Sequence, residues 1–232
     1  MRRVLAFLLA ALSASLIIPA FLASPASAQT SASPAFCAGR LQLNPSSSKA
    51  EAEAAFDLLA TTATGAAVDP ATALKAMFAK KGMKTFENEA AFARLGELDA
   101  YVYENCPGNK LPVTAIDYEF QGIPDALPAG VTQIKFTNNA PKEEHELIVA
   151  PLLPAGESED LEKLLAMPDK KVAKYVDVDR ADFIFARPGE SSHTVTELEP
   201  GKYIYACFIP VGGKESGKPH FMQGMYGTFT VS

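Results

Sequence analysis

The chain has 232 residues, of which 48% are apolar and 21% are charged, the ordinary composition of a globular protein with a hydrophobic core. Its formal net charge is -6, and it has no basic cluster. This acidic balance disfavours a nucleic-acid partner.

The first segment, residues 1–28, is typical of a secretory signal peptide. Two arginines precede an apolar stretch, and small residues follow it up to Ala26-Ser27-Ala28. Two prolines interrupt the stretch before it reaches the ~20 apolar residues of a membrane-spanning helix. We therefore expect cleavage after Ala28 and an exported, periplasmic or extracellular protein whose mature chain has no membrane span.

Residues 29–112 predict a small helical domain, because they are rich in alanine and carry larger apolar residues at helical spacing. Ser48 can cap a helix through AEAEAAFDLLA, and Asp69-Pro70 can begin a second helix that Gly82 ends. A further helix is expected over residues 88–105. One stripe of that helix should face the core: Phe92, Leu95, Val102 and Cys106.

The three cysteines, Cys37, Cys106 and Cys207, can form one internal disulfide in an oxidising compartment and leave one thiol over. Cys37 and Cys106 bracket the helical domain, and a bridge between them would stabilise it by roughly 4 kcal/mol in a chain-entropy account. The alternative is two unrelated buried thiols. With the bridge, Cys207 would be an unpaired thiol that needs protection, and a metal ion is one protector.

Residues 113–232 contain short β-type segments separated by glycine, proline and asparagine turns, which predicts an all-β sandwich. The segments are VTAIDYEF, VTQIKFTN, HELIVAP, SSHTVTEL, KYIYACF and YGTFTV. Between them, ESEDLEKLLAM has an acidic first turn and leucines at helical spacing, so we expect a short inserted helix.

Four side chains of this region could hold one metal ion together: His145, Cys207, His220 and Met225. Two imidazoles, a thiolate and a weak thioether suit copper, because sulfur ligands hold Cu(I) and imidazole accommodates Cu(II). Zinc needs no thioether, and hard cations prefer oxygen ligands. Taken singly, each residue is weak evidence: Cys207 and Met225 are more often core residues than ligands, His145 could be a hydrogen-bonded core histidine, and His220 could be a surface loop residue.

Order and spacing make residues 113–232 resemble the cupredoxins, the blue copper family that includes plastocyanin and azurin. Residues 220–231 resemble plastocyanin's histidine, four residues, methionine, glycine and last strand. Residues 199–207 resemble the turn and strand before the thiolate ligand, and His145 follows Asn138-Asn139 as the family's first histidine follows an asparagine-containing loop. The resemblance implies a Greek-key sandwich with one mononuclear copper, and the helices make the whole an α+β multidomain fold.

The chain departs from the family in two places. Twelve residues, Phe208–Pro219, separate the thiolate from the second histidine, where the family loop is usually short. Glu146 stands where the family commonly has asparagine, and with Glu143 and Glu144 it is either solvated or acts on the ligands from outside. His193 lies in a polar run and is interpreted as exposed.

The leading function hypothesis is a one-electron carrier. The resemblance implies a redox partner that docks on an apolar rim around His220 at the protein surface. This rim would comprise Pro210, Pro219, Phe221 and Met222. One alternative is copper storage or exchange with a copper donor or acceptor, and another is a metal-free interaction module that uses the helical domain. An enzyme is not expected, because no further catalytic constellation is recognisable.

Overall fold

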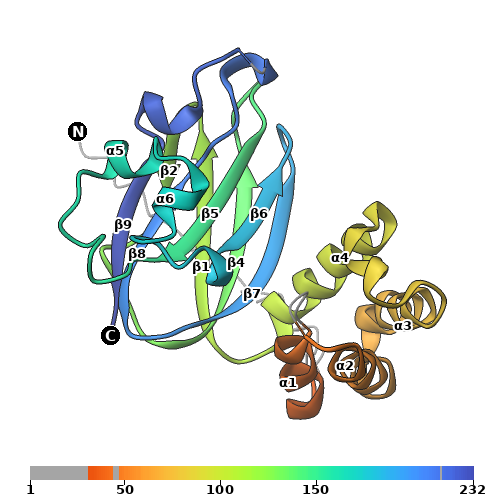
Figure 1. Ribbon diagram of the computed structural model, residues 1–232. Coiled ribbons are helices and arrows are strands. Elements are labelled where there is room, and N and C mark those ends of the chain that lie inside the picture. The colour runs from red at the N-terminus through yellow and green to blue at the C-terminus, as the bar shows by residue number, and fades with distance from the viewer. Residues whose placement is uncertain (1–30, 44–46, 215) are drawn as a thin grey trace, which may run out of the picture.

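The computed structural model describes residues 31–43, 47–214 and 216–232, so the predicted signal peptide lies outside the described residues. A group of helices precedes a two-layered β-sandwich and lies against one side of it (Figure 1). This arrangement confirms the expected α+β fold class. Within the described ranges, no helix combines the length and the apolar character that crossing a bilayer requires.

The helical part of the described chain contains α1 (Pro34–Gln42), α2 (Lys49–Thr62), α3 (Val68–Lys81) and α4 (Glu89–Asn105), with the 3-10 turns η1 (Gly65–Ala67) and η2 (Gly82–Glu87) before and after α3.

The ends of these helices follow their capping residues. Ser48 accepts the N–H of Glu51, and the Glu51 carboxylate accepts the N–H of Ser48, which is a capping box. Gly82 ends α3 at a φ of 56°, a backbone conformation that favours glycine. The predicted start of α3 is wrong: the helix begins at Val68, and Asp69 lies in its first turn, because η1 runs directly into it.

The core-facing stripe of α4 differs from the predicted one. Val102 and Cys106 are buried as expected and Leu95 packs at the edge of the core, but Phe92 is 56% exposed. The neighbouring Ala91 is fully buried instead. A small side chain there lets α4 pack closely on the other helices, and the large ring one position later then points to solvent.

Two links hold α1 on α4. Cys37 and Cys106 form the predicted disulfide, with an S–S distance of 2.08 Å and a sequence separation of 69. Beside it lies a buried ion pair, in which Arg40 donates from Nη2 to Asp99 Oδ2 at 2.8 Å and from Nε to Oδ1. The first and last helices of the group are therefore joined twice.

Two sheets form the sandwich in the described residues, which confirms the all-β prediction. The first sheet has the order β2 (Glu119–Gln121), β1 (Asn109–Ile116), β4 (Gly130–Asn138) and β7 (Ser191–Leu198). The second sheet has the order β3 (Ala126–Leu127), β9 (Tyr226–Val231), β8 (Gly201–Ala206), β5 (His145–Pro151) and β6 (Asp182–Ala186). Strand β6 was not among the predicted segments, and β1 begins before residue 113.

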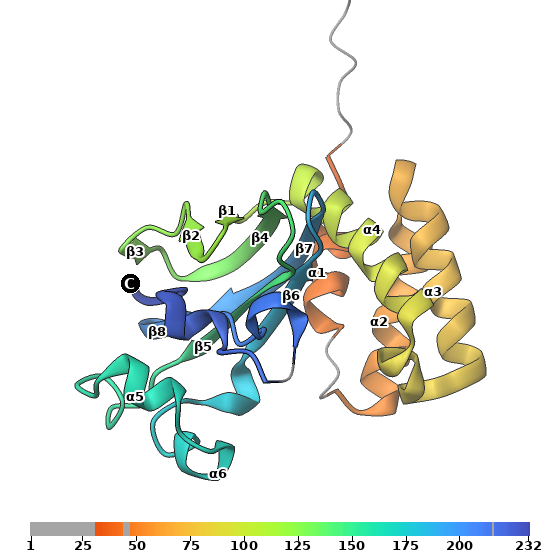
Figure 2. The ribbon, with the colours of Figure 1, turned by 90° about the horizontal axis from the view of Figure 1, so that it is seen from above.

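The helical group packs through α4 and α1 against β7 and part of β4 and leaves β2 and most of β1 uncovered (Figure 2). Val195 of β7 belongs to the helical core, and Gln133 of β4 donates to the carbonyl oxygen of Cys106 at 3.1 Å. His193, predicted to be exposed, is half-buried here, with its ring 5.4 Å from that of Tyr103 on α4. The local pattern of β7 could not show that a helix would cover it.

Between β5 and β6 the chain forms an insert with α5 (Leu161–Leu165), α6 (Asp169–Val172) and η3 (Val178–Arg180), which confirms the predicted helix in ESEDLEKLLAM. Asp160 caps α5 by accepting the N–H of Lys163 at 2.8 Å. The insert lies beside the second sheet, away from the long helices (Figure 2).

Candidate metal centre

Three of the four predicted ligands lie at one end of the second sheet. Strand β5 begins at His145, β8 ends just before Cys207, and β9 begins just after Met225. Because β5 is antiparallel to β8 and β8 is antiparallel to β9, these strand ends meet at the same edge. The N–H of Cys207 donates to the carbonyl oxygen of Met225 at 3.1 Å, which extends this pairing to the ligands themselves.

A buried asparagine shapes the loop that leads to the first histidine. Asn138 donates from Nδ2 to the carbonyl oxygens of Glu143 at 2.8 Å and Ala186 at 3.0 Å. Its Oδ1 accepts the N–H of Ala140 at 2.9 Å. These bonds fix the loop between β4 and β5, so that β5 starts with His145 turned toward the interior.

Strand alternation turns the ligand side chains into the space between the sheets. Cys207 and Met225 belong to the same buried cluster as Leu147, which lies two residues after His145 on β5. The side chains of all four predicted ligands, including His220, are 0% exposed. The group is therefore part of the sandwich core rather than of its surface.

The donor atoms of His145, Cys207 and His220 point at one another. The two Nδ1 atoms lie 3.1 Å apart, and Cys207 Sγ lies 3.4 Å from His220 Nδ1 and 3.9 Å from His145 Nδ1. The ligand atoms of the three residues all lie within 4.8 Å of one another. Donor atoms that share one ion at bond lengths of about 2.0–2.3 Å are spaced in this way.

Burial favours the uncharged forms of these three groups. It lowers the pKa of His145 to about 4, and the nearby His220 adds to the effect. Burial also lowers the pKa of His220, against the opposing influence of Glu143, and it raises the pKa of Cys207 to about 12. Neutral imidazole is the form that binds a metal, and a thiolate buried here requires a cation beside it.

The long loop Phe208–Pro219 is closed at its base. Pro210 and Pro219 form a β-bridge, and the N–H of His220 donates to the carbonyl oxygen of Ile209 at 2.9 Å. The two ends of the loop therefore lie next to each other, and the extra residues extend away from the ligand group. The part of the loop that positions His220 is short, so the loop length is compatible with a compact ligand set.

Two of the three nearby carboxylates hold this loop. Glu146 accepts the first N–H of the loop at 2.9 Å, and Glu143 accepts the N–H of Gly212 at 3.0 Å. Glu143 Oε2 also lies 3.6 Å from His220 Nε2. Solvation, one of the two interpretations of these carboxylates, holds only for Glu144, which is exposed.

The expected surface position of His220 is wrong. The ring of Tyr118 contacts the buried His220 ring edge-on, with 5.0 Å between the centroids. Phe221 is buried as well, so the predicted apolar rim is reduced to the exposed Met222 and two half-buried prolines. Tyr118 lies in the turn between β1 and β2, and no sequence pattern connects that turn with a histidine so far along the chain.

The donor set fits copper. Among the described residues, the buried Nε2 atoms of His145 and His220 have no hydrogen-bond partner, whereas both Nδ1 atoms face the thiol of Cys207. The group contains no carboxylate oxygen, the ligand that hard cations prefer. Two imidazoles, one thiol and the buried thioether of Met225 suit a single copper ion.

No protein-family description matches the chain, and no curated protein matches it. Among solved structures, reduced auracyanin of Roseiflexus castenholzii is 16% identical over 54% of this chain and 98% of its own, with a TM-score of 0.35. Auracyanin A of Chloroflexus aurantiacus, a "blue" copper protein, is 22% identical over 52% and 99%, with a TM-score of 0.30. Rusticyanin of Thiobacillus ferrooxidans is 17% identical over 54% and 79%, with a TM-score of 0.33. Values as low as these do not by themselves establish a relationship.

Two facing sheets enclose a buried histidine-cysteine-histidine group with a methionine beside it, all at one end of the sandwich. The C-terminal region is a two-sheet β-sandwich whose buried side chains suit one mononuclear copper ion.

Proposed function

We propose that the chain is an exported one-electron carrier whose copper is held by His145, Cys207, His220 and Met225. The observation that carries the proposal is the convergence of two imidazole Nδ1 atoms and one thiol, 3.1 to 3.9 Å apart, in a fully buried group. When bound, copper supplies a reversible one-electron change between Cu(I) and Cu(II).

The role of the polypeptide is to hold the ligands in one arrangement. His145 begins a paired strand, and the backbone of Cys207 is hydrogen-bonded to that of Met225 at 3.1 Å. His220 is held by the closed base of its loop through the bond to Ile209. Ligands fixed on paired strands move little, and a site that must accept two oxidation states benefits from that rigidity.

Burial separates this proposal from its alternatives. Storage or delivery of copper requires the ligands to reach a donor or acceptor, but none of the four side chains exposes any surface. A metal-free interaction module would bury two imidazoles and a thiol with little compensating hydrogen bonding, which is costly. A redox partner protein would approach through Tyr118, which covers His220.

Export rests on two features. The disulfide between Cys37 and Cys106 is typical of oxidising compartments, and residues 1–28 have the order of a signal peptide. Cleavage after Ala28, measured by mass spectrometry of the N-terminus of the exported protein, tests this part of the proposal separately from copper binding.

The visible spectrum of the protein after addition of Cu(II) tests the ligand roles. We expect an intense thiolate-to-copper band that Cys207→Ser abolishes, because a hydroxyl is far harder to deprotonate than a thiol. Met225→Leu should keep copper bound and shift the reduction potential, because it removes only the weak axial ligand and keeps the apolar volume.

His193→Ala is the control for these substitutions, because His193 lies beside Tyr103 of α4 and does not belong to the ligand group. It should change neither the band nor the reduction potential. An unchanged band in Cys207→Ser, or identical behaviour of the serine and Met225→Leu variants, would show that the ligand roles are assigned wrongly.

A further inference from the structure

The insert between β5 and β6 is larger than the strand pairing requires. The two strands are antiparallel neighbours, with Val149 opposite Asp182, and a tight turn of a few residues could join such strands. The chain instead runs through α5, α6 and η3 before it returns. The strand pairing alone therefore does not account for this insert.

The insert forms a hydrophobic cluster of its own with the outer face of the second sheet. The cluster contains Ala150, Leu152, Leu164, Leu165, Val176, Ile204, Ala206 and Phe221, with Tyr226 at its edge. Three of these residues are chain neighbours of the predicted ligands: Ala206 precedes Cys207, Phe221 follows His220, and Tyr226 follows Met225.

Strand alternation explains this pattern. Where Cys207 points inward to the ligand group, its neighbour Ala206 points outward to the insert, and the same holds for Met225 and Tyr226. The insert therefore packs against the backbone that carries the ligands, from the side opposite to the ligands themselves.

Leu164 of α5 belongs to this cluster. Its side chain is 0% exposed, and α5 lies against η5 (His220–Gln223), the short turn that carries His220 and Phe221. The backbone of η5 is also held from the sheet, because the N–H of Phe221 donates to the carbonyl oxygen of Cys207 at 2.8 Å. The turn is thus held between the sheet and the insert.

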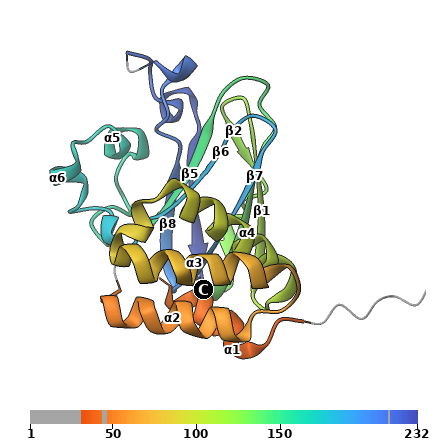
Figure 3. The same ribbon diagram turned by 90° about the vertical axis from the view of Figure 1, so that its right-hand side faces the viewer.

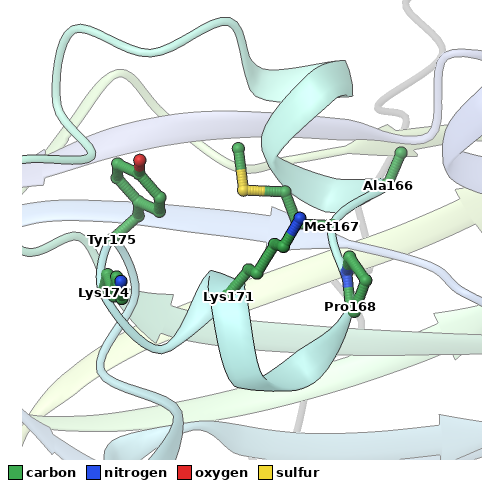
Figure 4. A pocket seen from close by; sticks show the side chains of 6 residues that line it. All are labelled: Ala166, Met167, Pro168, Lys171, Lys174 and Tyr175. Carbon is green, nitrogen blue, oxygen red and sulfur yellow. The ribbon is translucent and has the colours of Figure 1, made fainter.

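The insert is itself firmly attached to the sheet. Leu152 pairs with Val176 in a β-bridge, and the N–H of Leu153 donates to the carbonyl oxygen of Tyr175 at 2.8 Å. Its exposed side carries a separate pocket (Figure 4). The pocket is lined by Ala166, Met167, Pro168, Lys171, Lys174 and Tyr175.

We propose that the insert is a positioning element for the metal ligands and that Leu164, acting through Phe221, is its central positioning residue. This inference rests on the proposed function for its purpose, but the packing it describes exists without copper. Loss of Leu164 leaves a cavity behind Phe221, so that η5 opens more often and His220 and Met225 are held less tightly.

Amide hydrogen exchange of the copper-free protein tests the positioning directly. The amides of Met222, Gly224 and Met225 donate within this turn, at 2.9, 3.0 and 3.2 Å. In Leu164→Ala we expect them to exchange about tenfold faster or more, as a cavity under the turn implies. Copper should leave the loaded variant for a chelator faster by a comparable factor, and Leu164→Met, which keeps the volume, should restore both rates.

Two control variants separate positioning from a general loss of stability. Leu74→Ala removes an equally buried leucine from α3, and Met167→Ala trims the pocket side of the insert. Neither should change the three amides. If Leu164→Ala does not fold, Leu164→Val makes the same comparison with a smaller cavity.

Unchanged amide exchange in the Leu164 variants, or an equal change in Leu74→Ala, would overturn the inference. Faster exchange of these amides in a protein that shows no thiolate-to-copper band would support the positioning role and overturn the proposed function instead. The two failures are therefore distinguishable in one set of samples.

Discussion

Glu143 joins the long loop to the second histidine. Its carboxylate accepts the N–H of Gly212 and lies 3.6 Å from His220 Nε2. A negative charge at this place stabilises Cu(II) over Cu(I), so Glu143→Gln should raise the reduction potential by on the order of 50 mV while its amide oxygen keeps the bond to Gly212. A redox titration followed by the visible band measures the shift.

Glu144→Gln is the matched control, because it removes the same charge from the neighbouring residue. The Glu144 side chain is exposed and lies 3.7 Å from Arg187. Its effect on the potential should be small, since solvent screens an exposed charge. Equal shifts in the two variants would mean that Glu143 acts only through the net charge of the protein.

At the residue scale, the sequence predicts the four ligand side chains but not the side chain that packs over His220. His145, Cys207, His220 and Met225 are recognisable because their types and spacing are local properties of the chain. The contact of Tyr118 with His220 depends on how the first sheet closes over the second, and no local pattern encodes it.

Elements are held together in the helical part by a buried pair of opposite charges. Arg40 of α1 and Asp99 of α4 are both nearly inaccessible to solvent. Asp99→Asn leaves the guanidinium without its counter-charge, and we expect a loss of about 3–5 kcal/mol in the free energy of unfolding. Guanidinium titration followed by circular dichroism measures it.

An exposed ion pair of the same region provides the comparison. Lys75 and Asp57 lie 3.0 Å apart with about half of each side chain in solvent, so Lys75→Met should cost less than about 1 kcal/mol. A cost for Asp99→Asn no larger than that of Lys75→Met would contradict the importance of the buried pair. Helix spacing predicts where α1 and α4 lie in the chain, but two charged residues 59 positions apart give no sign that they meet.

The whole molecule separates its metal end from its helical end. Figure 3 shows the long helices over the lower part of the sandwich and the loops around η4 (Val211–Gly213) and η5, in dark blue, at its top. Removal of the disulfide in a Cys37→Ala, Cys106→Ala double variant should therefore lower the free energy of unfolding by about 4 kcal/mol and leave the visible band unchanged.

Thermal unfolding and the spectrum of the same copper-loaded sample check both halves of this expectation. A changed band would mean that the helices set the ligand geometry from a distance. The two-part organisation itself could be predicted from the change in composition along the chain. The packing of Val195 in the core of the helical part could not be predicted. Val195 is an apolar residue on β7, and only the tertiary structure shows that helices pack against it.

The complete burial of Cys207 also bears on how the chain acquires its one correct disulfide. Three cysteines permit three single-bridge isomers, and the native one links only α1 and the end of α4. Once the two sheets close, Cys207 offers no exposed surface to an oxidant or to another thiol. If the sandwich folds before the helical part, only the native disulfide can form, because both non-native isomers require the thiol of Cys207, which is already buried.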